Sequence, residues 1–455
     1  MKHKYYLVII ALFLYSIGTD AQEAKTNDSA RVNQYGQEVK WQRLHGEAQE
    51  GILKFTSDDK SYSIWLDNRV LFDAGIFSDD ALNKLGNGAK IRRARFAIKS
   101  ILWDKWYAEL DLDFAGSQLE LKDAYIMHMF DSRNLNIKAG HFREGFGLET
   151  NTTSRYVNFI ERSLASKLDP SRHLGVQAIH WRDKYVVSGG VHFNSVGDLE
   201  EAEISKDANK DNGQDEGYSL TGRAVYRPII DNEKVVHLGV AGSYRTPKTT
   251  AEIPNSYRYS TRSYSSVNRK KFIDTDNILN VDNTTMLDFE LAAHYKGLMI
   301  QSEYKMVNVN RTNNLSTVNI NGFYAQAGFL LFGGNYNYNK VEGEFTRLTR
   351  GKEYGDLEIA FRYDFVDAND FGAQVYGGSA EGYTMGLNYH FNPNVKFMVN
   401  YVYTNNDRYA NGKGKLFVGN DINGNLTTDP AEVTQTEGNG GDDFGMVTMR
   451  MEIDF

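Results

Sequence analysis

The chain has 455 residues, no cysteine, and 51 Lys and Arg against 59 Asp and Glu, which gives a formal charge of −8. The lack of cysteine excludes disulfides, thiolate metal sites and cysteine catalysis, and the acidic balance argues against a nucleic-acid-binding protein. Aromatic residues make up 13% of the chain. After the N-terminus no apolar run reaches the 18 residues that indicate a membrane-spanning helix.

The first 21 residues have the pattern of a secretory signal peptide. Lys2 and Lys4 precede an apolar stretch at 5–17, and the small residues Thr19 and Ala21 precede a cleavage site that we expect before Gln22. A short buried helix would also be apolar, but a position at the extreme N-terminus favours the signal. We therefore expect an exported protein.

From residue 62 onward, apolar and polar residues alternate in short segments, as they do in strands with one apolar face. The clearest case is 382–406, in which a turn at 392–394 separates two alternating segments. We predict sixteen strands, at 62–74, 90–101, 104–115, 119–130, 134–143, 173–182, 185–196, 217–229, 234–246, 284–295, 298–310, 319–331, 355–366, 380–391, 395–406 and 443–455.

A soluble β-sandwich could show the same alternation, but three features favour a transmembrane barrel. The segments have about ten residues, the length that a tilted strand needs to cross a bilayer. Short turns alternate with long polar loops at 197–216, 247–283 and 407–442. The last strand ends on Phe455, like the assembly signal of outer-membrane proteins. The sequence therefore predicts an all-β fold, an antiparallel β-barrel of about 16 strands in the outer membrane of a Gram-negative bacterium.

A weaker segment at 340–348 would make seventeen strands. Both chain ends of such a barrel are expected in the periplasm, which requires an even number of strands. We therefore predict that 333–353 is a long periplasmic excursion. The expected domains are a signal peptide at 1–21, a short periplasmic segment at 22–58 and the barrel at 59–455.

Sixteen strands leave a water-filled channel inside the barrel, and about 40 residues before the first strand are too few for a plug domain. The ten His residues are scattered, and the chain has no H-E-x-x-H or G-x-S-x-G motif. We therefore expect a passive porin with no cofactor and no enzymatic activity. A barrel enzyme or an adhesin is the more remote alternative.

One stretch carries a family resemblance. The sequence GHFREGFGLETNTTSRYVNFIERSLASKLDPSRHLGVQ at 140–177 resembles the phosphate-selective porin O and P family, as do 91–100, 121–126 and 383–402. The resemblance implies a homotrimer. The other expected partners are outer-membrane lipid, at the apolar face of the strands, and the barrel assembly machinery, through the last strand that ends on Phe455. The resemblance also implies a third outer loop folded inward, here 144–172, and passage of small anions, phosphate or polyphosphate among them. A general or sugar-type porin of the same fold is the alternative.

Three basic clusters could select anions, because Arg and Lys side chains can replace part of an anion's hydration shell. The first is Arg93, Arg95 and Lys99, which share one face of a predicted strand and should point into the lumen. Arg92 would take the opposite face, near a membrane interface. Alternatively, the three cations pair with carboxylates of the next strand, such as Glu109.

The second cluster lies in the predicted inward loop. It includes Arg143, Arg155 and Arg162, in a segment with a net charge of only +1. Many of its charges must therefore form internal salt bridges that hold the loop's shape. We expect Arg155 and Arg162 at the constriction, where charge acts most strongly on a passing ion.

The third cluster is 257–271, which has five basic residues and no acid and includes Arg258 and Arg262. The family resemblance implies that such an outer loop draws anions inward, whereas a solvated surface loop is the alternative. The acidic segment 197–216 should weaken anion capture at the channel mouth. The electric field of these acids decays over about 8 Å at physiological salt. The acidic segment therefore need not cancel the effect of a basic constriction.

A weak calcium-loop pattern lies near the C-terminus. Its positions 1, 3, 5, 9 and 12 hold Asp421, Asn423, Asn425, Asp429 and Glu432. Leu426 stands where such a loop needs glycine, so turn-forming residues of an outer loop are the favoured interpretation.

Overall fold

The computed structural model describes residues 31–198, 217–247, 253, 255–411, 414–434 and 440–455. The predicted signal peptide and most of the acidic 197–216 segment lie outside these residues. The chain divides into two units, Met1–Leu44 and His45–Phe455. In the first, β1 (Arg31–Val32) and β2 (Glu38–Val39) form a small hairpin. Of the helices that the structure describes, none is long and apolar enough to cross a membrane.

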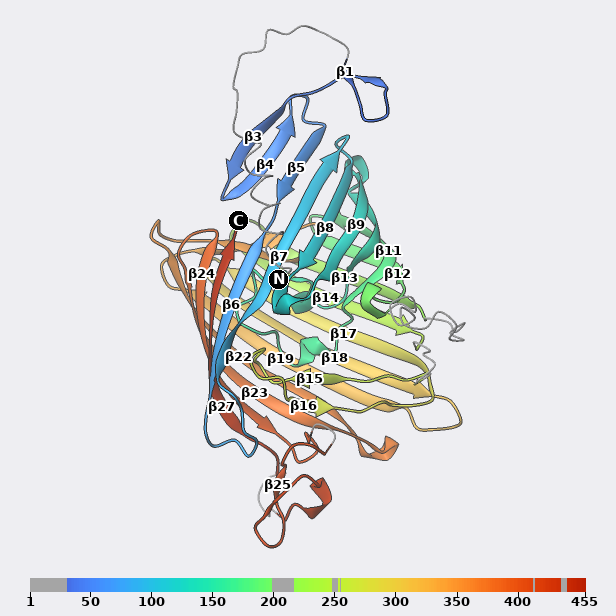
Figure 1. Cartoon of the computed structure of the whole chain (residues 1–455), viewed down its shortest axis with the longest axis vertical. Helices are drawn as coiled ribbons and strands as arrows, with labels where there is room; N and C mark the ends of the chain where they lie inside the picture. Colours follow the sequence, from blue (N-terminus) through green and yellow to red (C-terminus); the bar gives the residue numbers. More distant parts are fainter. Residues whose placement is uncertain (1–30, 199–216, 248–252, 254, 412–413, 435–439) are drawn as a thin grey trace, which may run out of the picture. The chain divides into compact units, whose positions relative to one another are not determined.

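The second unit contains a closed antiparallel barrel (Figure 1). Within the described residues its wall has sixteen strands, which confirms the predicted number. They are β6 (Arg69–Phe77), β7 (Gly88–Leu102), β8 (Trp106–Asp113), β9 (Glu120–Phe130), β10 (Leu135–Arg143), β11 (Arg172–Arg182), β12 (Tyr185–His192), β13 (Ser219–Ile230), β14 (Lys234–Arg245), β17 (Val281–Tyr295), β18 (Leu298–Arg311), β19 (Val318–Leu330), β22 (Asp356–Asp370), β23 (Val375–His390), β24 (Val395–Asn406) and β27 (Phe444–Asp454).

Three further strands extend the barrel sheet. They are β3 (Leu44–Gln49), β4 (Ile52–Ser57) and β5 (Tyr62–Leu66). β4 pairs with β5, and β5 pairs with the part of β7 that continues beyond β6. The compact unit that contains these strands and the barrel is His45–Phe455.

The remaining short strands form hairpins outside the wall. They are β15 (Ser260–Arg262) with β16 (Lys271–Asp274), β20 (Asn335–Asn339) with β21 (Glu344–Thr349), and β25 (Gly419–Asn420) with β26 (Leu426–Thr427). The weak 340–348 segment thus belongs to a separate two-stranded sheet and adds no strand to the wall. This agrees with the even strand count.

The two faces of the wall differ in polarity, as the alternation predicts. In β23, Tyr383, Met385 and Leu387 are exposed on the outer face. In β27, Arg450 and Glu452 are buried on the inner face. Since side chains of a strand point alternately to opposite faces, the apolar set meets lipid and the polar set meets the lumen.

An ion pair crosses the seam at which the barrel closes. β27 pairs with β6, and Arg450 lies directly opposite Asp73 in this register. The Arg450 guanidinium donates two hydrogen bonds to the Asp73 carboxylate, at 2.7 and 2.8 Å. Bidentate pairs of this kind fix orientation as well as distance, so this pair stabilises the closure between the first and last strands.

The expectation that Arg92 faces away from the lumen was wrong. A β-bulge shifts the register between β6 and β7, so that Leu71 pairs with Arg93 but Phe72 pairs with Ile91. Arg92 is the extra residue. A bulge breaks the two-residue period of a strand, and Arg92 turns inward, where its Nε donates to Glu161 at 2.7 Å.

Candidate channel lining

The segment 144–171, here called the β10–β11 loop, is hydrogen-bonded to inner-face side chains on distant parts of the wall. The Leu148 N–H donates to Glu303 of β18 at 2.5 Å. The Ile160 N–H donates to Asn400 of β24 at 2.8 Å. The loop also bonds to β6, β7, β22 and β23. These contacts fix the loop backbone against several strands.

A buried lysine holds the end of this loop. The Nζ atom of Lys305 on β18 lies 2.8 Å from Asp169 of the loop, 3.2 Å from Asp288 and 3.0 Å from Glu303. Lys305 is only 1% exposed. A buried charge is tolerated when it is paired and hydrogen-bonded, and here one cation compensates three carboxylates that would otherwise repel one another.

A cavity of about 270 Å³, here called the basic cavity, lies between β7, the β10–β11 loop and the β15–β16 segment. Hydroxyl groups of Ser and Thr line it together with one acid, Glu161. Its five basic side chains are Arg92, Arg162, Lys167, Arg262 and Lys271. The cavity therefore carries a net charge of +4.

Most of this positive charge is uncompensated. Arg92 and Lys167 share Glu161, at 2.7 and 3.7 Å. Arg162 donates to two loop carbonyls, those of Glu149 and Thr152. Carbonyl oxygens carry no net charge, so this arginine keeps its full positive charge.

Two further cations of the cavity also lack an acid. Lys271 donates to the Ser260 hydroxyl at 2.7 Å. Within the part of the chain that the structure describes, Arg262 and Lys271 have no carboxylate partner. These groups, together with the hydroxyls, are donors that can bind an anion.

A larger cavity of about 540 Å³, here called the mixed-charge cavity, is lined by β6 to β11, the β10–β11 loop and the β20–β21 hairpin. Eight basic and six acidic side chains line it. Arg95 lies 2.9 Å from Asp111, and Lys99 lies 2.5 Å from Asp67 and 3.6 Å from Glu109. Arg95 and Lys99 of the first cluster therefore pair with carboxylates of the next strand, which is one of the two alternatives from the sequence.

The structure separates the two arginines that we expected together at a constriction. Arg162 lines the basic cavity, whereas Arg155 lines the mixed-charge cavity and pairs with Asp67 and, at 3.1 Å, with Asp454. Arg143 lines the same cavity as Arg155 and donates to a loop carbonyl. The sequence spacing gave no sign of this separation, since it depends on the path of the loop.

The remaining predicted cations fall in different surroundings. Arg93 is on the inner face of β7 and makes no ion pair within the described residues. Arg262 joins the basic cavity, whereas Arg258 pairs with Asp274 and lines neither cavity. The β15–β16 segment therefore contributes through Arg262 and Lys271, and Lys271 was not singled out by the sequence.

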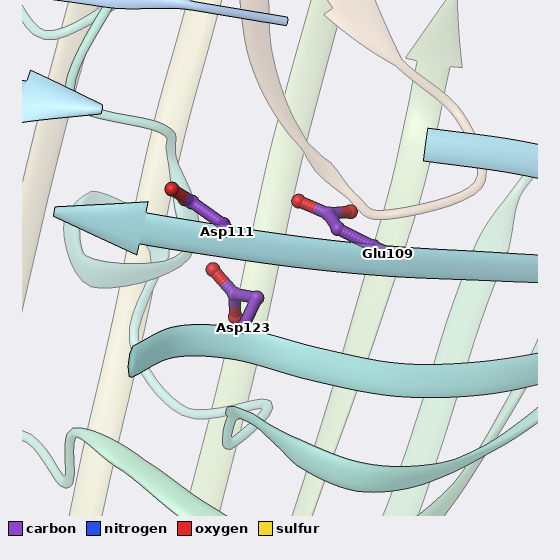
Figure 2. A group of neighbouring side chains, drawn as sticks. All are labelled: Glu109, Asp111 and Asp123. Carbon is purple, nitrogen blue, oxygen red and sulfur yellow. The ribbon is translucent and has the colours of Figure 1, made fainter. Parts of the chain in front are cut away.

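Among the residues that the structure describes, two groups of three carboxylates lie close enough to hold a metal ion. Glu109 and Asp111 project from one strand and Asp123 from its neighbour (Figure 2). Each already has a cationic partner. Arg172 donates three hydrogen bonds to Asp123, Arg95 pairs with Asp111, and Lys99 pairs with Glu109. The second group, Asp288, Glu290 and Glu303, surrounds Lys305 and Arg223. These are ion-pair networks.

The calcium-like segment forms turns. The Asp421 carboxylate accepts hydrogen bonds from the backbone N–H groups of Asn423 and Asn425, at 2.9 and 2.8 Å. Asp429 accepts from the Ala431 N–H at 2.8 Å. Short side chains that bond to the following backbone are typical of turns, which agrees with the favoured interpretation of this segment.

Sequence reasoning missed the role of the β20–β21 hairpin. Arg223 donates to the Glu342 and Gly343 carbonyls at 3.0 and 2.9 Å, and Arg227 donates to that of Lys340 at 2.7 Å. Phe345 packs in a buried cluster with wall residues. The predicted excursion thus turns back against the inner face of the wall. Its aromatic alternation was the available signal.

A closed barrel with an apolar outer face and a charged interior is the architecture of outer-membrane porins. The chain matches the model of the family described as phosphate-selective porin O and P over residues 65–424, and it belongs to this family. It is an outer-membrane porin-like channel of a Gram-negative bacterium.

Two curated relatives are similar to this chain. Porin O of Pseudomonas aeruginosa is 24% identical over 401 residues, which cover 80% of this chain and 88% of that protein. An uncharacterized protein of Caulobacter vibrioides is 26% identical over 361 residues, which cover 77% and 70%. Among solved structures, the trimer form of OmpT from Vibrio cholerae aligns with a TM-score of 0.51 at 10% identity, covering 87% of this chain and 100% of that one. This last likeness concerns the fold alone.

Proposed function

We propose that the protein is a passive channel that prefers small anions. The observation that carries the proposal is the basic cavity, in which five basic side chains face one acid. Fixed charge in a narrow passage between protein walls of low dielectric constant acts more strongly on an ion than charge on an open surface. Because exposed charges are screened within about 8 Å at physiological salt, the local excess outweighs the overall charge of −8.

We further propose that the β10–β11 loop lies across the lumen and narrows it. Its hydrogen bonds to β6, β18, β22 and β24 support this placement. An anion would then pass the basic cavity on one side of the loop and the mixed-charge cavity on the other. The Arg92–Glu161 pair would hold the loop beside β7.

Phosphate or polyphosphate is the anion that we propose as the preferred solute. Arginine forks match the oxygens of a phosphate in pairs, and both Arg162 and Arg262 line the basic cavity without a carboxylate partner among the described residues. A general or sugar-type porin is the second candidate. It is favoured by the mixed-charge cavity, where Arg95 and Lys99 are closely paired with carboxylates and their charges are therefore compensated.

Chloride current in a planar bilayer distinguishes these candidates. If phosphate binds in the basic cavity, inorganic phosphate added in the millimolar range should lower the chloride current to about half or less, because a bound anion occupies the path. Sulfate and glucose serve as comparison solutes. An unchanged current with phosphate would contradict phosphate selectivity and support the general porin.

The proposed partners of the channel are further copies of the chain, membrane lipid and the machinery that inserts barrels. We propose a homotrimer embedded in outer-membrane lipid and inserted by the barrel assembly machinery through its last strand. The terminal Phe455 is exposed, and its backbone exchanges two hydrogen bonds with Asn68 at the seam, at 2.8 and 3.0 Å. Its aromatic ring is therefore free for recognition while its backbone closes the barrel.

A further inference from the structure

The turn of the β20–β21 hairpin brings two carboxylates into the mixed-charge cavity. Glu342 and Glu344 both line it. Among the residues that the structure describes, neither side chain has a hydrogen-bond or ion-pair partner. The other acids of this cavity are all paired with cations, as Asp111 is with Arg95 and Asp123 is with Arg172. These two glutamates are therefore the acids of the cavity that form no ion pair within the described residues.

The backbone of the hairpin is fixed where these glutamates stand. Arg223 donates to the carbonyl of Glu342, and the ring of His237 lies 2.6 Å from the Tyr338 hydroxyl. Arg227 is fully buried and donates to the Lys340 carbonyl. The turn is thus attached to β13 and β14, so the backbone positions of Glu342 and Glu344 in the cavity are fixed.

The surroundings of Glu344 oppose its ionisation. Burial and, second, the neighbouring charge of Glu342 raise the pKa of Glu344, and the net value is about 8. Arg223 of β13, Arg143 of β10 and Arg162 of the β10–β11 loop face it and lower the pKa. On the hairpin itself, Arg347 forms its ion pair with Glu50, with 2.7 Å between Nη1 and Oε2. Glu344 is therefore mostly neutral below pH 7 and mostly charged above pH 9.

We propose that Glu342 and Glu344 are specificity-determining residues that form a carboxylate filter in series with the basic cavity. An unpaired carboxylate inside a narrow lumen repels anions and attracts cations. The filter would therefore limit the anion preference of the channel, and it would act most against multiply charged anions. The proposal rests on the proposed anion channel but concerns the opposite sign of charge, on a different element.

The test is the anion-to-cation permeability ratio, measured from reversal potentials in a potassium chloride gradient. We expect the wild-type ratio to fall about two- to fourfold between about pH 6 and pH 9, as Glu344 gains its charge. Glu344→Gln should keep its pH 6 value at both pH values. The double variant Glu342→Gln/Glu344→Gln should exceed the wild type at both. Glu353→Gln, on the same connection but exposed, is the matched control and should behave like the wild type.

Two results would overturn the filter. One is a Glu344→Gln channel that keeps the wild-type pH response, and the other is a double variant whose ratio does not exceed that of the wild type. Glu344→Asp retains the charge and should retain a pH response, which separates loss of charge from a disturbed hairpin. A wild-type channel that prefers cations, but becomes less cation-selective in the double variant, would contradict the anion channel and leave the filter intact.

Discussion

Replacing Arg262 and Lys271 together by glutamate is expected to abolish most of the anion preference. The two changes remove four units of charge from a cavity with a net +4, and the expected charge is therefore zero. Two unit charges about 8 Å apart interact by about 2 kcal/mol at an effective dielectric constant of about 20. Allowing for screening, we expect the anion-to-cation permeability ratio to fall about three- to tenfold.

The matched control for this experiment is Arg269→Glu. Arg269 lies on the same loop and is exposed, as Arg262 is, but it does not line the basic cavity. Its replacement should change the ratio by less than about half, because its charge lies away from the cavity and is screened by salt. Equal effects of Arg269→Glu and Arg262→Glu would mean that the loop acts by general surface charge. Arg162 is less suitable, since it also donates to two loop carbonyls.

Replacing Lys305 by methionine is expected to destabilise the protein by about 3 kcal/mol or more, since breaking a buried ion pair leaves uncompensated charge. Asp169, Asp288 and Glu303 would lose their shared cation. The measurement is the temperature at which the barrel unfolds in detergent at a fixed heating rate, which should fall by several degrees. The Lys305–Asp169 pair attaches the end of the β10–β11 loop to β18. Without it the loop should move more, and the noise of the current through the channel should increase.

Two variants check the cause of that loss. Lys296→Met removes an exposed lysine that lies 3.7 Å from Glu233 on a turn, and it should change stability by at most about 0.5 kcal/mol. Adding Asp288→Asn to Lys305→Met should restore part of the stability, because Asp288 is paired with Lys305 alone among the described residues. If the double variant is no more stable than Lys305→Met, charge repulsion is not the cause.

The strands could be predicted because their signal is local. Alternation of apolar and polar residues depends only on the two-residue period of a strand, so it identified each wall strand. The weaker 340–348 segment was left out of the wall because the barrel needs an even number of strands. The bulge at Arg92 could not be predicted in this way. One extra residue in β7 reverses which face a side chain takes, and the sequence around it, Arg92-Arg93, fits either register.

The channel lining was only partly predictable because it depends on contacts between distant segments. Arg162 and Arg262 were predicted as members of two separate clusters. The paths of two loops bring them to one cavity. Arg155 and Arg258 were chosen for their charge, yet each has a carboxylate partner far along the chain or across a hairpin. Glu342 and Glu344 lie in a turn whose return toward the wall depends on Arg223 and Arg227.

The reversal potential of the wild-type channel in a potassium chloride gradient tests the anion-channel proposal most directly. The basic cavity predicts a potential whose sign shows that chloride passes more readily than potassium, at about neutral pH and about 0.1 M salt. Potassium preference under the same conditions, or no conductance from purified and folded protein, would contradict it.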